Sequence, residues 1–286
     1  MRHLVLGGTG TVGSLVVSGL IEKGESVRVV TRDAAKAKSL PQGATGVVGD
    51  LAKPETYEGI FRDYDTLFLL TANGTSDLME GLGAVAEARR TKARRVVHLS
   101  IHDVEKCPEA PHFASKIAVE TALKESDLSW TILRPNNFYQ NDWWWKDAIV
   151  QYGVYPQPIG SKGLSRVDTR DIAAAAVRAL TEPGHAGRTY TLAGPDVLTG
   201  EQTAKAFAEA LGRPVAYAGD DLDAWAKSMA PYLPPWAIFD YRLMYDAFQR
   251  KGLVATPAQL EETRTILGSA PRSFAAFVKE FAAAVR

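Results

Sequence analysis

The stretch HLVLGGTGTVGSLVVSGL (residues 3–20) decides the fold of this chain. An apolar run comes first, three spaced glycines follow, and the remainder has the pattern of a helix. Glycine accepts a tight turn between a strand and a helix and lets backbone amides approach a pyrophosphate closely. The helix that follows adds free N–H groups and the positive end of its dipole. We therefore predict a dinucleotide-binding turn. Its predicted contact residues are Gly7, Thr9, Gly10, Thr11, Val12 and Gly13.

Short apolar runs alternate with helical patterns through the first half of the chain. The predicted strands are residues 3–6, 27–31, 45–48, 66–70, 95–99 and 130–133. The predicted helices are residues 12–22, 34–40, 78–90 and 111–124, with a short one that begins at Pro54. Strands that alternate with helices predict an α/β fold of the Rossmann type, with a doubly wound parallel sheet.

The rhythm changes after Arg134, where the sequence becomes irregular and aromatic. The stretch SRVDTRDIAAAAVRAL (165–180) predicts a short strand and a helix, and residues 189–192 predict another strand. From Thr199 onward the pattern is mostly helical. We expect a nucleotide-binding domain of residues 1–135, to which 166–193 return, and a smaller substrate-binding lobe of 136–165 and 194–286.

The composition narrows the class of protein. Lys plus Arg equals Asp plus Glu at 33 each, so charge gives no reason to expect nucleic acid or an anionic membrane as a partner. No apolar run of about 20 residues predicts a membrane span. No Cys and His cluster predicts a metal site. Cys107 is the only cysteine, and the first residues lack the pattern of a signal peptide, so we expect a cytoplasmic protein.

The end of the second strand distinguishes NADP from NAD. NAD sites place an acidic residue there for the ribose 2′-hydroxyl, whereas this chain has Thr31 and Arg32. A guanidinium can pair with a 2′-phosphate, so NADP is favoured, and the alternative is that Arg32 is only a solvated charge. Asp33 has the position of a helix N-cap.

Two further strand ends contribute candidates. Asp50 can accept from the adenine amino group while Leu51 covers the ring; alternatively, Asp50 caps the helix that begins near Pro54. The fourth strand is followed by another set at the carboxyl edge, where ligands bind in open sheets. That set is Thr71, Ala72 and Asn73.

The segments GGTGTVG, TRD, GDL, LLTAN, HLS, HFASK and WTILRPNNFYQN occur in this order. With them the chain resembles, over essentially its whole length, the NmrA-like group of atypical short-chain dehydrogenases/reductases. It is most similar to the NADPH-dependent quinone oxidoreductases and triphenylmethane reductases of that group. The resemblance implies hydride transfer from NADPH to a planar conjugated acceptor such as a quinone, dye, imine or enone. The alternative that it implies is a non-catalytic regulator that senses NADP. A homodimer is plausible.

Short-chain dehydrogenases use a Ser and a Tyr-x-x-x-Lys pair, and the resemblance carries these roles to Ser100 and Lys116. His112 stands where the Tyr would be. Residues four apart share a helix face, so His112 and Lys116 are expected to point the same way, and His can deliver a proton near neutral pH. The alternatives are a helix-end residue for His112 and a strand-end cap for Ser100.

The segment after the sixth strand supplies the last candidates. By resemblance it borders the nicotinamide and contacts the carboxamide, with Asn137 and Phe138 as the expected residues. Three tryptophans in a row cannot all face one way on a helix. Tyr139, Trp143 and Trp144 are therefore predicted to form an aromatic wall for the acceptor; the alternative is core or dimer packing.

Overall fold

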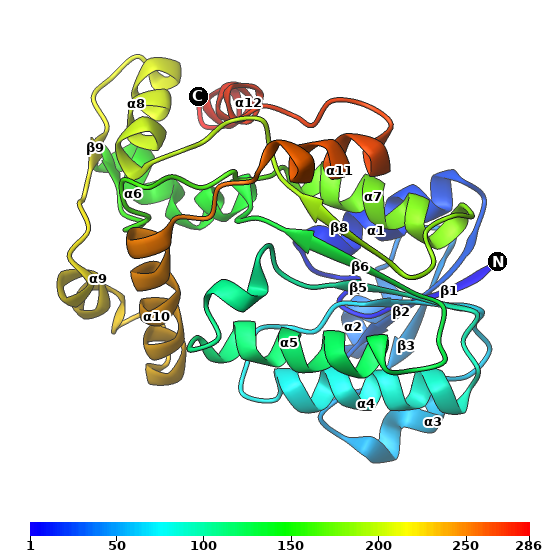
Figure 1. Ribbon diagram of the computed structural model, residues 1–286. Helices are drawn as coiled ribbons and strands as arrows, with labels where there is room; N and C mark the ends of the chain where they lie inside the picture. The colour runs from blue at the N-terminus through cyan, green and yellow to red at the C-terminus, as the bar shows by residue number, and fades with distance from the viewer. The chain divides into compact units, whose positions relative to one another are not determined.

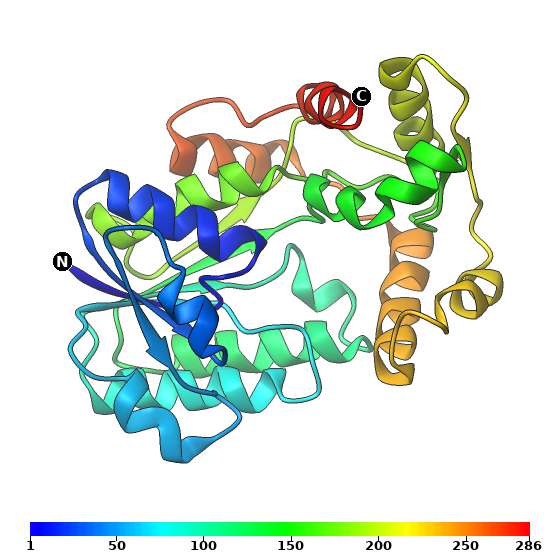
Figure 2. The same ribbon diagram turned by 180° about the vertical axis from the view of Figure 1, so that it is seen from behind.

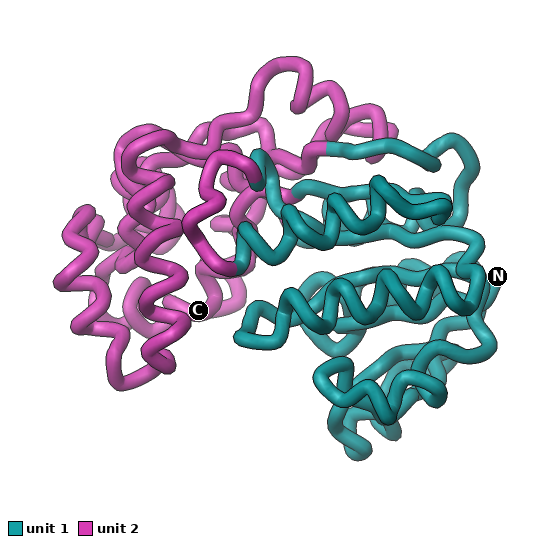
Figure 3. The backbone as a smooth tube through the Cα atoms, turned by 60° about the horizontal axis from the view of Figure 1, so that its bottom comes forward, with its two compact units in different colours: residues 1–104, 112–134, 169–190 teal, residues 105–111, 135–168, 191–286 magenta.

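The computed structural model describes residues 1–286, which form two compact units (Figure 3). Unit 1 consists of residues 1–104, 112–134 and 169–190. Unit 2 consists of residues 105–111, 135–168 and 191–286. The separate roles expected for a nucleotide-binding domain and a substrate-binding lobe stay predictions.

A seven-stranded sheet in the order β3-β2-β1-β4-β5-β6-β8 forms the centre of the fold. Its strands are β1 Arg2–Val5, β2 Ser26–Thr31, β3 Ala44–Val48, β4 Thr66–Leu69, β5 Arg95–Leu99, β6 Trp130–Pro135 and β8 Arg188–Leu192. The pairings from β3 through β6 are parallel. Val5 of β1 pairs with Val29 on one side and with Phe68 on the other. The strand order therefore reverses at β1, as predicted for a doubly wound sheet.

Helices cover both faces of this sheet (Figures 1 and 2). Helices α1 (Thr11–Glu22) and α7 (Thr169–Thr181) pack together on one face, while α4 (Asp77–Arg90) and α5 (Pro111–Lys124) lie on the other. The short helices are α2 Ala34–Lys38, η1 Pro54–Thr56, α3 Tyr57–Ile60 and η2 Val104–Lys106. Two covered faces explain why the strands are apolar runs without alternation.

Unit 2 is mostly helical, as predicted, and has a small aromatic core. Its elements are η3 Tyr139–Trp145, α6 Lys146–Gln151, β7 Val154–Tyr155, α8 Gly200–Leu211, β9 Ala216–Tyr217, α9 Leu222–Met229, α10 Pro235–Lys251, α11 Pro257–Leu267 and α12 Phe274–Ala284. The short strands β7 and β9 pair in parallel, which the sequence pattern did not predict. Phe207 packs edge-on against both Phe274 and Phe281, and this contact joins α8 to α12.

One predicted strand is wrong. Residues 165–168 form no strand; they lie beside several separate segments, with a bridge from Val167 to Phe138 and bridges from neighbouring Leu164 to Leu198 and Leu253. A stretch whose bridges go to separate segments does not form a continuous ladder with one strand.

Cys107 is buried, with its sulfur 3.9 Å from the carbonyl oxygen of Leu243, and burial raises the pKa of its thiol. None of the helices has both the length and the apolar character that a membrane crossing requires.

Candidate functional site

The glycine turn joins β1 to α1 and is shaped by its own backbone. Gly7 has φ +69°, a left-handed conformation that favours glycine. The amide of Gly10 donates to the carbonyl of Gly7 at 3.0 Å, and the amide of Ser14 donates to the carbonyl of Gly10 at 2.9 Å. Gly10 is the N-cap of α1 and has no side chain with which to cap the helix. The amides of the first turn thus remain available to an anion.

Gly13 allows a close contact between α1 and the turn. A Cβ at this position would lie 2.1 Å from the carbonyl oxygen of Gly7 and 2.8 Å from the Cα of Gly8. The start of α1 therefore packs directly on the turn. Any side chain at Gly13 would push the helix N-terminus away from the turn that it faces.

Arg32 follows β2 and is exposed, with no hydrogen bond or ion pair in the structure. Oδ1 of Asp33 accepts from the amides of Ala35 at 2.8 Å and Lys36 at 3.3 Å, so the predicted N-cap of α2 is confirmed. The only carboxylate next to Arg32 is thus engaged by the helix start. A hollow of about 360 Å³ is lined by residues that include Thr9, Ser14 and Lys36, and Arg32 is not part of its lining.

Asp50 lies two residues after the end of β3. Its Oδ1 accepts from the amide of Ala52 at 3.1 Å, and its other carboxylate oxygen has no partner in the protein. Lys53, and not Asp50, is the N-cap of η1, so the alternative role of Asp50 as a helix cap is wrong. Leu51 is half-buried against the core beneath it.

Lys116 of α5 lies in a buried polar cluster. Its Nζ donates to Thr71 Oγ1 at 2.7 Å and to Asp77 Oδ1 at 2.8 Å. Ser115 Oγ donates to the second carboxylate oxygen of Asp77 at 2.6 Å, and Thr71 Oγ1 also bonds to Asp77. Burial alone would raise the pKa of Asp77, but the ammonium of Lys116 and these hydrogen bonds hold it below its usual value. The carboxylate and the ammonium form an ion pair between α4 and α5.

Asp77 was missed by the sequence reasoning. It opens α4 in the stretch SDLME (76–80), which has the appearance of an ordinary acidic helix start. Thr71 was predicted as a cofactor contact, and the structure places it beside Lys116. Ala72 and Asn73 follow it and are exposed.

His112 is half-buried at the start of α5, with its ring edge-on to Phe113 at a centroid distance of 4.8 Å. The hydrogen bonds of Lys116 go to Thr71 and Asp77 and not to His112. The expectation that the two side chains point the same way stays a prediction. His112 stays a candidate proton donor.

Ser100, after β5, is buried and turned toward a second ion cluster. Its hydroxyl donates to Glu120 Oε1 at 2.6 Å. Glu120 also accepts from Arg134 Nη2 at 2.6 Å and from Lys124 Nζ at 2.8 Å. Burial would raise the pKa of Glu120, but these three donors hold it below its usual value. The hydroxyl proton of Ser100 is thus committed to Glu120, which leaves only its oxygen lone pairs for a ligand.

His98 lies within β5 and is fully buried. Its Nδ1 lies 3.2 Å from the carbonyl oxygen of Leu69, and its Nε2 has no hydrogen-bond partner. Burial, with the positive charge of Lys116 as a second cause, lowers the pKa of His98 to about 4. This ring is therefore neutral at physiological pH.

In unit 2 the predicted residues after β6 differ in exposure. Asn137 and Phe138 are half-buried. Tyr139 is fully buried, with its ring against Phe274 and its hydroxyl 3.3 Å from the carbonyl oxygen of Arg272. Tyr139 is thus a core residue, and its assignment as a substrate contact is not kept.

The three consecutive tryptophans after Asp142 differ in their exposure to solvent. Trp144 is 72% exposed and Trp143 is 36% exposed, with the Trp143 ring 4.4 Å from that of Phe281. Trp145 is half-buried. Trp143 and Trp144 therefore remain available to an acceptor. The structure contains no group of three or more His, Cys, Asp or Glu that could hold a metal ion.

Comparisons with known proteins agree on one family. The model of the NmrA-like family matches residues 2–237. An NAD(P)H azoreductase of Xenophilus azovorans is 33% identical over 284 residues, which cover 98% of this chain and 98% of that one. A (4-alkanoyl-5-oxo-2,5-dihydrofuran-3-yl)methyl phosphate reductase of Streptomyces griseus is 34% identical over 237 residues, 82% of this chain and 83% of that one.

The fold has a close match among solved structures. An NADPH-dependent quinone oxidoreductase of Escherichia coli, solved with NADPH, superimposes with a TM-score of 0.87 at 21% identity, over 98% of this chain and 99% of that one. The family model, which matches residues 2–237, settles the classification: the chain belongs to the NmrA-like family.

Proposed function

We propose that the protein is an NADPH-dependent reductase of small conjugated molecules. One observation carries the choice of cofactor: the uncapped N-terminus of α1 follows β1, and an exposed and unpaired Arg32 follows the neighbouring strand β2, while Asp33 is engaged as a helix cap. A pyrophosphate fits the first feature and a 2′-phosphate fits the second. The names of the relatives, an azoreductase and a furanone phosphate reductase, agree with the predicted reductase.

The assignment of residues within unit 1 follows from their chemistry. The amides of Thr11 and Val12 would hold the pyrophosphate, with Gly10 leaving room beside it, and Arg32 would hold the 2′-phosphate. The free carboxylate oxygen of Asp50 would accept from the adenine amino group. A second group of residues would contact the remainder of the dinucleotide. That group is Gly7, Thr9, Gly13, Leu51, Thr71, Ala72, Asn73 and Lys116.

In unit 2 we assign Asn137 and Phe138 to the nicotinamide and Trp143 and Trp144 to the acceptor. NADPH supplies the hydride when it is bound, so the protein has only to orient the partners and provide a proton where the acceptor needs one. His112 is the candidate for that proton, because an imidazole side chain can act as a general acid.

The acceptor class is the finer part of the proposal. The exposed tryptophans favour a planar aromatic molecule, and quinones, azo dyes, triphenylmethane dyes, imines and enones all fit that description. The alternative, a regulator that binds NADP without turnover, has no separate observation in its favour. A cytoplasmic location, a homodimer and the absence of a nucleic-acid partner stay predictions.

The decisive experiment pairs binding with turnover. NADPH fluorescence would measure cofactor binding by the full-length protein, and the loss of absorbance at the NADPH band would measure oxidation with each acceptor class. We expect binding of NADPH in preference to NADH and turnover with at least one planar acceptor. Tight binding with no turnover on any acceptor would favour the regulator; no binding of either cofactor would contradict both functions.

A further inference from the structure

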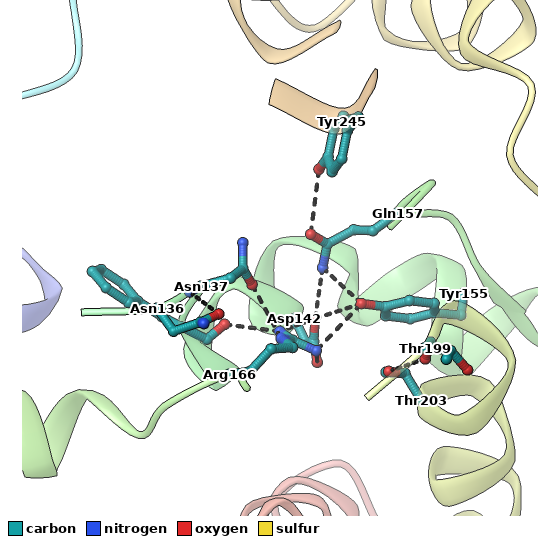
Figure 4. Close-up of polar contacts among 10 residues, drawn as sticks. Asn136, Asn137, Asp142, Tyr155, Gln157, Arg166, Thr199, Thr203 and Tyr245 are labelled. Atoms are coloured by element: carbon teal, nitrogen blue, oxygen red, sulfur yellow. Dashed lines mark hydrogen bonds and ion pairs between the residues drawn. The ribbon is translucent and has the colours of Figure 1, made fainter. Parts of the chain in front are cut away.

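Arg166 is a charged side chain buried completely within unit 2 (Figure 4). Asp142 pairs with it through both carboxylate oxygens, at 2.9 Å from Nη2 and 3.0 Å from Nη1. Burial would lower the pKa of Arg166, but the Asp142 carboxylate holds it above its ordinary value, so the guanidinium stays charged. Burying such a pair is costly because both charges lose their contact with water.

The remaining donors of Arg166 go to the segment after β6. Nε donates to the side-chain oxygen of Asn137 at 3.0 Å, and Nη2 donates to the carbonyl of Phe138 at 2.8 Å. Nη1 also donates to the hydroxyl of Tyr155 at 3.3 Å. All the N–H donors of the guanidinium therefore have partners, and two of those partners belong to the segment assigned to the nicotinamide.

This contact fixes the orientation of the Asn137 amide by chemistry. Arginine has donors and no acceptor, so the atom of Asn137 that faces Nε has to be Oδ1. The NH₂ group then points away from the guanidinium, as Figure 4 shows. Asn137 is half-buried, and its NH₂ group makes no hydrogen bond within the protein. The side chain thus offers donors, and not an acceptor, to a bound molecule.

The side-chain amide of the adjacent Asn136, unlike that of Asn137, uses both its oxygen and its nitrogen within the protein. Asn136 is buried, its Nδ2 donates to the carbonyl of Leu253 at 2.7 Å, and its Oδ1 accepts from the amide of Asn137 at 2.8 Å. Backbone bonds then attach the segment to Val167, whose amide donates to the carbonyl of Asn137 and whose carbonyl accepts from the amide of Tyr139, each at 2.9 Å. Asn136 anchors the segment, which leaves the Asn137 amide as the group presented outward.

Asp142, the ion-pair partner of Arg166, is itself held by further hydrogen bonds. Asp142 accepts from Gln157 Nε2 at 2.6 Å, and Gln157 Oε1 accepts from the hydroxyl of Tyr245 at 3.3 Å. Figure 4 shows this chain of contacts running from Arg166 to Tyr245 of α10. A guanidinium held on every side keeps the Asn137 amide in one orientation, which is the preorganisation that recognition needs.

We propose that Arg166 is a positioning residue that makes Asn137 an obligate hydrogen-bond donor, so that the site selects a carbonyl oxygen on its ligand. The inference rests on the proposed function, which supplies two sources of that chemistry: the carboxamide of the nicotinamide and the carbonyl of a quinone acceptor. A ligand that presents only donors at this point is rejected, because donor would face donor.

The test replaces the outward donor of Asn137 by an acceptor and keeps the oxygen that faces Arg166. Asn137→Asp retains an oxygen for Arg166 and replaces the outward NH₂ by an acceptor. Asn141→Asp is the matched control, because Asn141 is a half-buried neighbour whose side chain makes no hydrogen bond. The measurements are NADPH binding by fluorescence without acceptor, and KM for a quinone.

We expect Asn137→Asp either to lower the affinity for NADPH or to raise the KM for the quinone, in each case by about 10-fold or more. Asn141→Asp should stay within about twofold of wild type in both quantities. A loss in NADPH binding assigns the donor to the carboxamide, and a loss confined to the quinone KM assigns it to the acceptor. If the wild type binds NADPH and reduces a quinone, and the two variants behave alike, the inference is contradicted but the proposed function is not. A wild-type protein that does neither contradicts the proposed function as well.

Arg166→Lys separates positioning from mere stability. Lysine keeps the charge but lacks the fork, so the Asn137 amide becomes free to rotate. We expect the folded variant to lose the preference of the wild type for carbonyl over thiocarbonyl ligands. One measure of this preference is the ratio of the binding affinities for NADPH and its thionicotinamide analogue. The other is the ratio of the KM values for a quinone and a thioketone. A lowered melting temperature with an unchanged ratio would show a structural role only. If the variant does not fold, Asn137→Asp decides.

Discussion

The ammonium of Lys116 lies 2.8 Å from a carboxylate oxygen of Asp77, and both side chains are buried. The pair orients the ammonium of Lys116, which also donates to Thr71. If Lys116 contacts the cofactor as proposed, a cofactor hydroxyl would meet an ammonium that Asp77 and Thr71 already hold in place.

Removing one member of the pair should cost more than removing both. Lys116→Met leaves a buried carboxylate unpaired, and we expect the free energy of unfolding to fall by about 3 kcal/mol. The double variant Lys116→Met/Asp77→Leu should recover most of that loss in a denaturant titration, but not the reductase activity. Recovery of activity along with stability would show that Lys116 contributes only to the fold.

Arg32→Ala should weaken NADPH binding and leave NADH binding nearly unchanged. A charge-assisted hydrogen bond to phosphate is worth about 1.5–3 kcal/mol, which corresponds to a loss of about 10-fold or more. Fluorescence titrations with both cofactors measure the effect. Arg62→Ala, at another exposed arginine of unit 1, is the control. A similar loss for both cofactors would remove Arg32 from the 2′-phosphate site.

His112→Phe should distinguish acceptors by their need for a proton. A triphenylmethane cation accepts hydride without protonation, whereas a quinone or an azo group gains a proton as well. We expect kcat to fall about 10-fold or more with the second class and to stay unchanged with the first. Steady-state assays of kcat with one acceptor of each class measure the effect. Unchanged turnover with both would exclude His112 from catalysis, and an equal loss with both would indicate a packing role.

Gly13→Ala should disturb the turn itself. The new Cβ would lie 2.1 Å from the carbonyl oxygen of Gly7, which is backbone that cannot simply rotate aside. We expect a loss of about 1–3 kcal/mol in unfolding free energy together with weaker NADPH binding. Gly59→Ala is the matched control, because a Cβ there has nothing within 4 Å. Wild-type binding by Gly13→Ala would show that the amides do not need this packing.

The neutral His98 should make the fold sensitive to mild acid. Its pKa is about 4 in the fold against an ordinary value of 6.5, so between these values the unfolded chain binds a proton that the folded protein does not. Stability therefore falls as pH is lowered through this window, by on the order of 3 kcal/mol in total.

Thermal unfolding of His98→Gln and wild type from pH 7 to pH 5 measures this contribution. His3 and His185 also have lowered pKa values, because burial disfavours their charged forms, so the difference between the two proteins is the relevant quantity. Above pH 5 the carboxylates Asp77 and Glu120, whose pKa values are lowered, do not yet contribute. Parallel curves for the two proteins would contradict the assignment.

Local patterns predicted the parts of the molecule that local chemistry determines. The glycines of the first turn and the cap at Asp33 involve neighbours within a few residues, and the strand and helix order follows from hydrophobic period. The buried ion pairs were not predictable in this way. Lys116 with Asp77 and Arg166 with Asp142 join residues that are 39 and 24 positions apart, so only the folded chain brings them together.

Two misassignments have the same origin. Tyr139 lies in a polar and aromatic segment that resembles a ligand loop, yet its ring enters the aromatic core with Phe274. Residues 165–168 resemble a strand, yet they hold an arginine that completes a cluster. The sequence around Arg166, SRVD, gave no signal of a buried charge, because its neighbours Ser165 and Asp168 are polar.

The single thiol of the chain has a practical consequence. Cys107 is buried in unit 2 and its pKa is raised, so it reacts with an alkylating reagent only when its surroundings open. The labelling rate of the native protein therefore reports the opening of unit 2 around Leu243, with no engineered probe and no background from unit 1. A molecule that binds to unit 2 and stabilises it registers as slower labelling, whether or not it is turned over.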